Sequence, residues 1–395
     1  MPPLRYFLVF AVFLNLLLNP VSATAASELP EEFSPILSQQ LNSLDLEQLE
    51  GYLEQIDRDL QEQVPKFSLK RIFEAIRSGE LNVKMEDIFK TLLGCFFREL
   101  FTHTSLLGKL LVLGAILGIL QHLQSAFEET TVAKLAHGIG LLALLTLALS
   151  SFSLAVQSGK EAISNMVGFM HALLPVLLTL MTALGNVTSV TLLHPLILAS
   201  LNFLGALTGN IVFPLIFFAA VLGIVSQLSD HFQVSRLADL FRDSSVLLLG
   251  LFLTLFIGIL GIQGVAGAVT DGIGLRTAKF LTGAFVPVVG KIMADAVDAV
   301  AGCSLFLKNA IGIVGALTIL LLCSFPVLKI LSVAVVYRLA AAMMQPLGTQ
   351  KLAECLQLLG NYLLVVFATV AAVGLMFFIT LTIVVGFGNM VVMLR

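Results

Sequence analysis

Tryptophan is absent from this chain of 395 residues, and cysteine, tyrosine and charged side chains are scarce. The four cysteines form no Cys-x-x-Cys pair and the six histidines form no His-x-x-x-His pair, so the common zinc and dithiol spacings are missing. No Gly-Lys-Ser or Gly-Lys-Thr loop occurs, which argues against a P-loop nucleotide hydrolase. Nucleic-acid binding has no basic cluster to support it. The sequence therefore predicts no catalytic residue, no cofactor and no metal site.

Apolar residues, in contrast, make up 58% of the chain, charged residues make up 12%, and the mean hydropathy is +0.99. A water-soluble fold of this composition would expose large apolar areas, so we predict an all-α, polytopic membrane protein. From residue 106 onward the apolar runs reach the roughly 20 residues that a helix needs to cross a bilayer core. We expect spans near 106–124, 135–156, 166–185, 190–212, 214–229, 245–268, 280–298, 309–325, 327–344 and 360–388.

The number of spans depends on two prolines. No charged loop lies at Pro214 or Pro326, so each is either a tight hairpin or a kink within one long helix. The sequence accordingly predicts about seven to ten spans.

The first 26 residues have the layout of a signal peptide. Arg5 precedes an apolar run over 6–18, and small residues follow at 23–26. The alternative is an uncleaved signal anchor, and both place residue 27 onward outside the cytoplasm. Residues 27–103 carry 15 acidic and 8 basic side chains, a net charge of −7, and predict a small, helical extracytoplasmic region. Residues 104–395 carry a net charge of +3.

The membrane part shows signs of an internal duplication. The segment AILGILQHLQSAF at 115–127 returns as AVLGIVSQLSDHF at 220–232, and two pairs of prolines share a spacing of 39 residues. We therefore predict a first membrane repeat over 104–213, a second over 214–325, and a partial third repeat with a final span over 326–395. The copies are parallel or inverted, depending on whether the third member of each set crosses the bilayer.

Charged residues inside apolar segments are candidate functional positions. Lys291, Asp295 and Asp298 follow one another at i, i+4 and i+7, which places them on one helix face. This face is either the solvated side of an interfacial helix, the lining of a polar path, a subunit contact or an ion relay. Arg338 lies deep in an expected span and should face protein, water or a partner, because a charge facing lipid costs about 2.5–3.5 kcal/mol.

Glycine recurs every third residue at Gly258, Gly261, Gly264 and Gly267. Glycine costs about 1 kcal/mol in a helix relative to alanine, so the run needs a compensating reason. We interpret it as a site of close helix packing, with a hinge as the alternative.

Two sets of segments give the chain a resemblance to a known family. They are LGK at 107–109 with QHLQSAFE at 121–128, and GIQG at 261–264 with DGIGLRTAKF at 271–280 and PVVG at 287–290. In these segments the chain resembles the stage III sporulation protein AE family. The resemblance implies a protein of endospore-forming bacteria, placed in the mother-cell membrane around the forespore. It also implies partners, namely other stage III sporulation complex proteins that include a separate ATPase.

The function that this resemblance implies is a multi-pass subunit of a sporulation channel of the feeding-tube type, required for forespore development. The family supplies no catalytic residues to carry over. An independent secondary transporter of a small solute or ion is the alternative, and self-association is left open. Besides these partners we expect contact with the lipid bilayer and none with nucleic acid.

Overall fold

The computed structural model describes residues 85–126, 131–228, 234–285 and 289–393, together with Gly51 and Glu54. These ranges form helices and contain no strand, which confirms the all-α class. The helices are α5 (Met85–Thr102), α6 (Thr104–Ala126), α7 (Thr131–Ala183), α8 (Val187–Leu207), α9 (Phe213–Leu228), α10 (Ser235–Phe285), α11 (Val289–Met344) and α12 (Gln350–Met393). The predicted signal peptide and nearly all of residues 27–84 lie outside the described residues.

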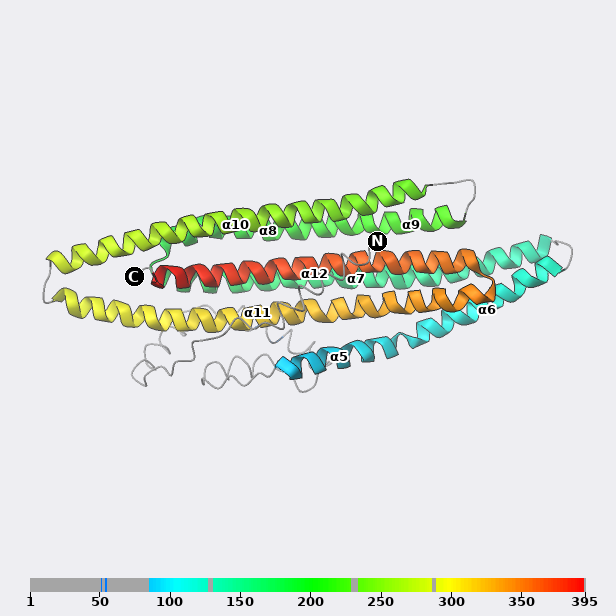
Figure 1. Ribbon diagram of the computed structural model, residues 1–395, viewed down its shortest axis with the longest axis horizontal. Coiled ribbons are helices and arrows are strands. Elements are labelled where there is room, and N and C mark those ends of the chain that lie inside the picture. The colour runs from blue at the N-terminus through cyan, green and yellow to red at the C-terminus, as the bar shows by residue number, and fades with distance from the viewer. Residues whose placement is uncertain are drawn as a thin grey trace.

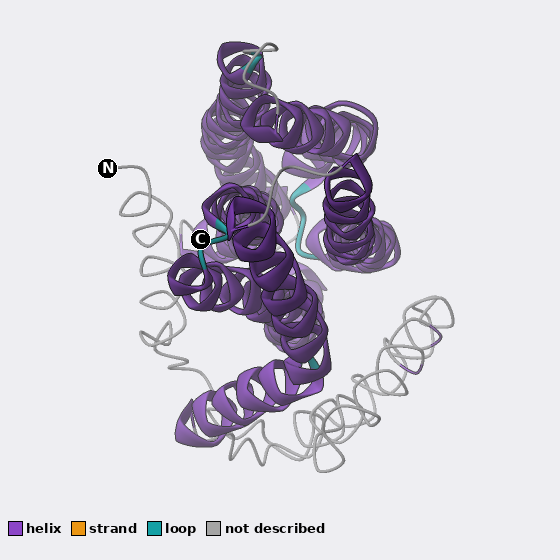
Figure 2. Ribbon diagram, turned by 90° about the vertical axis from the view of Figure 1, so that its right-hand side faces the viewer, coloured by secondary structure: helices purple, strands orange, loops and turns teal. Residues whose placement is uncertain are grey.

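The long helices run side by side along one axis (Figure 1). α11 and α12 pack along each other and against α7, and these three helices form the centre. α8, α9 and α10 form a layer on one side, where α10 also contacts α12, while α5 and α6 cover α11 and α7 on the other. Figure 2 views the bundle from the end that carries the α9–α10 and α11–α12 connections.

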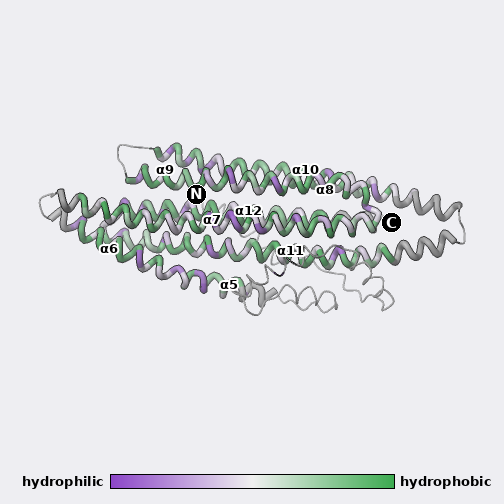
Figure 3. The backbone as a smooth tube through the Cα atoms, turned by 180° about the vertical axis from the view of Figure 1, so that it is seen from behind, coloured by the Kyte–Doolittle hydropathy of each residue, from purple (hydrophilic) through white to green (hydrophobic). Residues whose placement is uncertain are grey.

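Six stretches of the described helices are long and apolar enough to cross a membrane: Leu92–His122, Gly138–Ala183, Val187–Leu228, Ser235–Gly274, Val300–Leu347 and Gln350–Gly386. The described residues therefore offer six candidate spans, fewer than the seven to ten expected from the sequence. The shortest stretch has 31 residues and the longest 48, against about 20 for a bilayer core. Apolar residues recur along the coloured parts of the helices (Figure 3). Each helix must consequently tilt or extend beyond the hydrocarbon.

Joined segments explain the lower count. The expected spans 135–156 and 166–185 form the single helix α7, and 309–325 and 327–344 form α11 with Pro326 inside. Proline removes one backbone donor, but neighbouring helices and local distortion let a membrane helix continue through it. The expected span 280–298 is not one helix either, because α10 ends at Phe285 and α11 begins at Val289.

The chain continues through Pro214 as helix and forms no hairpin there. A short π-helix, η2 (Thr208–Val212), joins α8 to α9. In this π-helix the backbone N–H of Phe213 donates to the carbonyl of Thr208, five residues earlier, so the chain stays helical up to Pro214. The hydroxyl of Thr208, the first residue of the π-helix, donates a hydrogen bond to the carbonyl of Leu204 at 2.7 Å.

Glycines set the closest approaches in the centre of the bundle. A Cβ atom on Gly312 or Gly315 of α11, or on Gly374 of α12, would lie within 2.6 Å of a neighbouring side chain. The facing side chains are those of Val385, Leu173 and Cys323 respectively. Small residues of this kind let membrane helices approach closely and gain packing energy. The predicted repeat boundaries at 213/214 and 325/326 fall inside continuous helical stretches, and the duplication itself stays a prediction.

Candidate functional site

The first three turns of α12 carry a stripe of polar side chains, whereas the rest of the helix is almost entirely apolar. Gln350, Glu354, Gln357 and Asn361 are spaced three or four residues apart, so they share one face of the helix. Glu354, Gln357 and Asn361 are exposed, whereas Leu356 and Leu359 on the other face are buried. The helix therefore divides into a face that packs in the core and a face that is open and polar.

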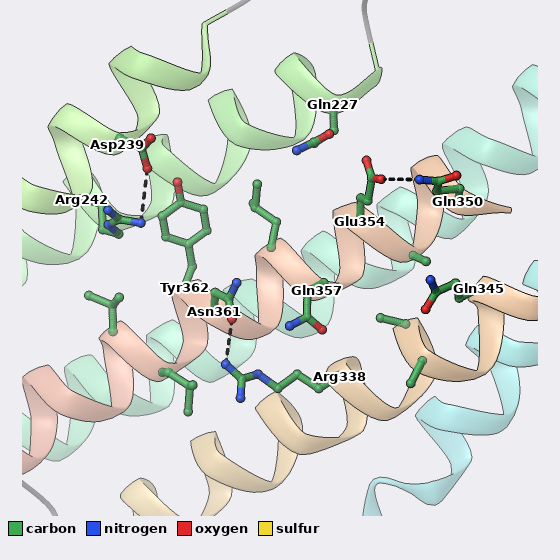
Figure 4. Close-up of a pocket in the computed structure, with 16 residues that line it drawn as sticks. Gln227, Asp239, Arg242, Arg338, Gln345, Gln350, Glu354, Gln357, Asn361 and Tyr362 are labelled. Carbon is green, nitrogen blue, oxygen red and sulfur yellow. Dashed lines mark hydrogen bonds and ion pairs between the residues drawn. The ribbon is translucent and has the colours of Figure 1, made fainter. Parts of the chain in front are cut away.

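The stripe lines a cavity of about 840 Å³ near one end of the bundle (Figure 4). Four α-helices and one short 3-10 helix contribute to its wall. Its polar lining residues are Gln227 of α9, Asp239 and Arg242 of α10, Arg338 of α11, Gln345 of the short helix η3 (Gln345–Leu347), and Gln350, Glu354, Gln357, Asn361 and Tyr362 of α12. Ala341 and Ala342 lie one turn after Arg338, and their small side chains leave room for the cavity.

Arg338 is the cation that the sequence singled out, and the structure places it in this cavity. Its Nη2 donates a hydrogen bond to Oδ1 of Asn361 at 2.7 Å. Its Nε is buried and has no hydrogen-bond partner among the described residues. The expectation that Arg338 faces protein or water agrees with this position. A guanidinium has five donors in a planar fork, so further acceptor oxygens fit here.

The second cation of the cavity is already paired. Arg242 lies 3.2 Å from a carboxylate oxygen of Asp239 and 3.0 Å from one of Asp243. Glu354, in contrast, accepts a hydrogen bond from the neutral amide of Gln350 at 3.1 Å. Figure 4 shows Glu354 and Arg338 on opposite sides of Gln357 along the cavity wall. The cavity thus offers an acidic and a basic group, each bonded to a neutral amide.

The predicted polar face lies elsewhere in the molecule. The first turns of α11 contain Lys291, Asp295 and Asp298. The side chains of these residues lie outside what the structure describes. Lys291 and Arg338 are 47 positions apart on one helix, or about 70 Å at 1.5 Å per residue. The structure therefore separates the charged positions into two groups at opposite ends of α11.

The four glycines of α10 differ in their surroundings. A Cβ atom on Gly267 would lie 2.8 Å from Oγ and 2.9 Å from Cα of Ser189, at the start of α8. No atom lies within 4 Å of such a Cβ on Gly258 or Gly261, while Gly264 is buried. Within this chain the close approach of α10 to α8 is thus located at Gly267. A packing role for the other glycines, including contacts between chains, stays a prediction.

A neighbouring feature escaped the sequence reasoning. Asp271, one turn after Gly267 and almost fully buried, accepts hydrogen bonds from the backbone N–H groups of Thr188 and Ser189, both at 2.8 Å. These are among the first, unpaired N–H groups of α8, and a carboxylate there also interacts favourably with the helix dipole. Asn186 holds the N-cap position but makes no capping hydrogen bond. A side chain from another helix therefore caps α8.

The sequence also did not predict the start of the polar stripe on α12. The expected final span began at residue 360, so Gln350, Glu354 and Gln357 lay between two expected spans. Their helical spacing was the signal that could have found the cavity wall. In the part of the chain that the structure describes, no group of three or more His, Cys, Asp and Glu side chains is placed to hold a metal ion.

The family model described as Stage III sporulation protein AE matches residues 67–388. The chain belongs to this family. A curated relative, the Stage III sporulation protein AE of Bacillus subtilis (strain 168), is 42% identical over 318 residues, which are 80% of this chain and 80% of that protein. No solved structure matches the chain. The resemblance found in the sequence is confirmed, and the family match covers every residue that lines the cavity.

Proposed function

We propose that this protein is a multi-pass membrane subunit of a feeding-tube type of channel complex between mother cell and forespore, and that forespore development requires it. The observation that carries the proposal is family membership over nearly the whole membrane bundle. Six helices long enough to cross a membrane supply the anchorage that a channel subunit needs. The protein resides, in this proposal, in the mother-cell membrane that surrounds the forespore.

The partners are other stage III sporulation proteins, including a separate ATPase. The sequence has no phosphate-binding loop of its own, so energy for transport comes from elsewhere in the complex. We place this chain in the role of a structural or channel component and not in that of an enzyme.

Orientation follows from the predicted signal peptide and the six candidate spans. If residue 27 onward is extracytoplasmic, alternate crossings put the α9–α10 and α11–α12 connections in the mother-cell cytoplasm. The cavity then opens on the cytoplasmic side. The α10–α11 connection and the polar face of Lys291, Asp295 and Asp298 lie on the opposite side, where we propose that they contact a partner or line the path.

A complementation experiment tests the proposal. The chain, carrying an affinity tag, replaces the relative in Bacillus subtilis, and heat-resistant spores are counted. We expect spores to return and other stage III proteins to co-purify with the chain. A protein that accumulates in the membrane, restores no spores and brings down no stage III partner would refute the proposal. Solute uptake by vesicles that contain this protein alone would instead favour an independent transporter.

The polar face has its own variant in the same strain. Asp295→Leu combined with Asp298→Leu should leave the protein inserted but lower spore formation or complex assembly. The reason is that a partner contact or a path lining loses two carboxylates. The matched control is Asp243→Leu, which removes an exposed carboxylate from α10. Normal spore formation at a normal protein level in the double variant would show that the face has no such role.

A further inference from the structure

The charges of the cavity differ in how they are neutralised. Arg242 has two carboxylate partners, Asp239 and Asp243, within 3.2 Å. Arg338 and Glu354 bond to neutral amides, those of Asn361 and Gln350. A hydrogen bond to a neutral side-chain amide satisfies one donor or acceptor and does not neutralise the charge of the group. Arg338 and Glu354 are therefore the two groups of the described cavity wall that are available to a ligand of opposite charges.

The separation of these two groups sets the length of such a ligand. Arg338 is fixed to Asn361, which lies seven residues after Glu354 on the same face of α12. Seven residues of α-helix rise about 10 Å. Gln357 lies between them and contributes a neutral amide with both donors and an acceptor. Along the cavity wall the anion Glu354, the neutral amide of Gln357 and the cation Arg338 therefore follow one another.

The chemistry of each group selects its counterpart. The two terminal nitrogens of the planar Arg338 guanidinium match the two oxygens of a carboxylate. The carboxylate of Glu354 matches an ammonium group, and the amide of Gln357 matches a peptide group. A single amino acid carries its ammonium and carboxylate on one carbon and cannot reach both ends. Three residues of extended peptide, at about 3.3–3.6 Å each, span about 10 Å. The contacts at the two ends fit because the side chains of Glu354 and Arg338 point apart, which places their charged ends farther apart than the backbone rise (Figure 4).

We propose that the cavity binds a free peptide of about three residues, with its terminal carboxylate at Arg338 and its terminal ammonium at Glu354. The volume of about 840 Å³ lies within the range of small-molecule sites, roughly 300–1,000 Å³. The biological meaning of the site rests on the proposed function, since it would give the channel complex a peptide cargo or effector. Binding itself depends on this chain alone.

The first experiment varies the ligand and leaves the protein intact. The purified full-length chain in lipid nanodiscs is titrated calorimetrically with trialanine, alanine, trialanine amide and N-acetyl-trialanine. We expect trialanine to bind and each of the other three to bind at least about tenfold more weakly. Alanine is too short, the amide lacks the carboxylate, and the acetylated peptide lacks the ammonium group.

The second experiment changes one charge at a time. Arg338→Gln and Glu354→Gln should each weaken trialanine binding at least about tenfold. Glu161→Gln is the matched control for Glu354, because Glu161 of α7 has the same exposed pairing with a glutamine four residues earlier, Gln157, at 2.9 Å. Arg236→Gln, an exposed cation of α10 outside the cavity, is the control for Arg338. Both controls should bind trialanine as the wild type does.

Several results overturn the proposal. They are no heat of binding for trialanine in the wild type, equal affinity for the amidated or acetylated peptide, or Arg338-dependent binding of inorganic phosphate in place of the peptide. The ligand series decides the matter even if a variant fails to fold. Failure here is distinct from failure of the proposed function, because complementation and co-purification in Bacillus subtilis are measured separately. A chain that restores spores and binds no peptide loses this inference alone.

Discussion

Replacing Gly267 with alanine should destabilise the protein, although alanine is the better helix former. The new Cβ would lie 2.9 Å from Cα of Ser189, whereas carbon atoms in good contact are about 3.5–4.0 Å apart. Because part of the obstacle is backbone, α10 and α8 must separate by about 0.6–1 Å. The same movement stretches the two bonds of Asp271, both now 2.8 Å, to the limit of hydrogen bonding or beyond.

The opposing terms can be compared. Overpacking costs about 1–3 kcal/mol, and the weakened bonds to a carboxylate add about 1 kcal/mol or more. The gain in helix propensity returns about 1 kcal/mol. We expect a net loss of about 1–3 kcal/mol and a fall in Tm of about 2–5 °C. Gly261→Ala is the matched control on the same helix, since no atom lies within 4 Å of its added Cβ, and its Tm should stay the same or rise.

The cysteines supply the assay. All four are free and buried, so a dye that becomes fluorescent on reacting with thiols reports their exposure as the purified protein is heated. Tryptophan fluorescence is not an option for this chain. The reasoning is refuted if Gly267→Ala and Gly261→Ala shift the Tm by the same amount. In that case α8 and α10 do not approach each other as closely as the structure shows.

Three further predictions concern other features. Asp271→Ala should lower the free energy of unfolding by about 2 kcal/mol or more in the same assay, because two buried N–H groups of α8 lose their acceptor; an unchanged Tm would contradict the capping role. Tyr337→Phe should cost about 1 kcal/mol, since the buried hydroxyl donates to the carbonyl of Ala148, and a gain in stability would argue against that bond. Alkaline phosphatase fused after residue 84 or after residue 395 should be active in a bacterial host and inactive after Gly348, because six spans put both ends on one side; activity after Gly348 would reverse the orientation.

The sequence predicted the class of the fold because composition and the length of apolar runs suffice for a helical membrane protein. It did not predict how the runs join. Pro214 and Pro326 have the appearance of turn signals, yet a bundle supplies enough neighbouring contacts and local distortion to carry a helix through them. The sequence therefore predicted more spans than the six candidates of the described residues.

Of the residues that line the cavity, the sequence singled out Arg338. Arg338 stood out because a charge in an apolar segment is costly and needs a reason. Its companion Glu354 did not stand out, because polar residues between two apolar runs are typical of a loop. Asn361 did not stand out either, because it is a single uncharged residue inside the span expected at 360–388. The capping of α8 by Asp271 depends on a contact between residues more than 80 positions apart, which no local pattern reports.

The continuity of α11 has a mechanical consequence. Pro326 lies 35 positions from Lys291 and 12 positions from Arg338, distances of about 52 Å and 18 Å along the helix. If the helix tilts about a pivot at Pro326, the long arm moves about three times as far as the short arm, and in the opposite direction. The segment of α11 after Pro326, which moves less, carries the guanidinium group of Arg338. A displacement of about 3 Å near Lys291 corresponds to about 1 Å at Arg338, enough to make or break its hydrogen bond to Asn361.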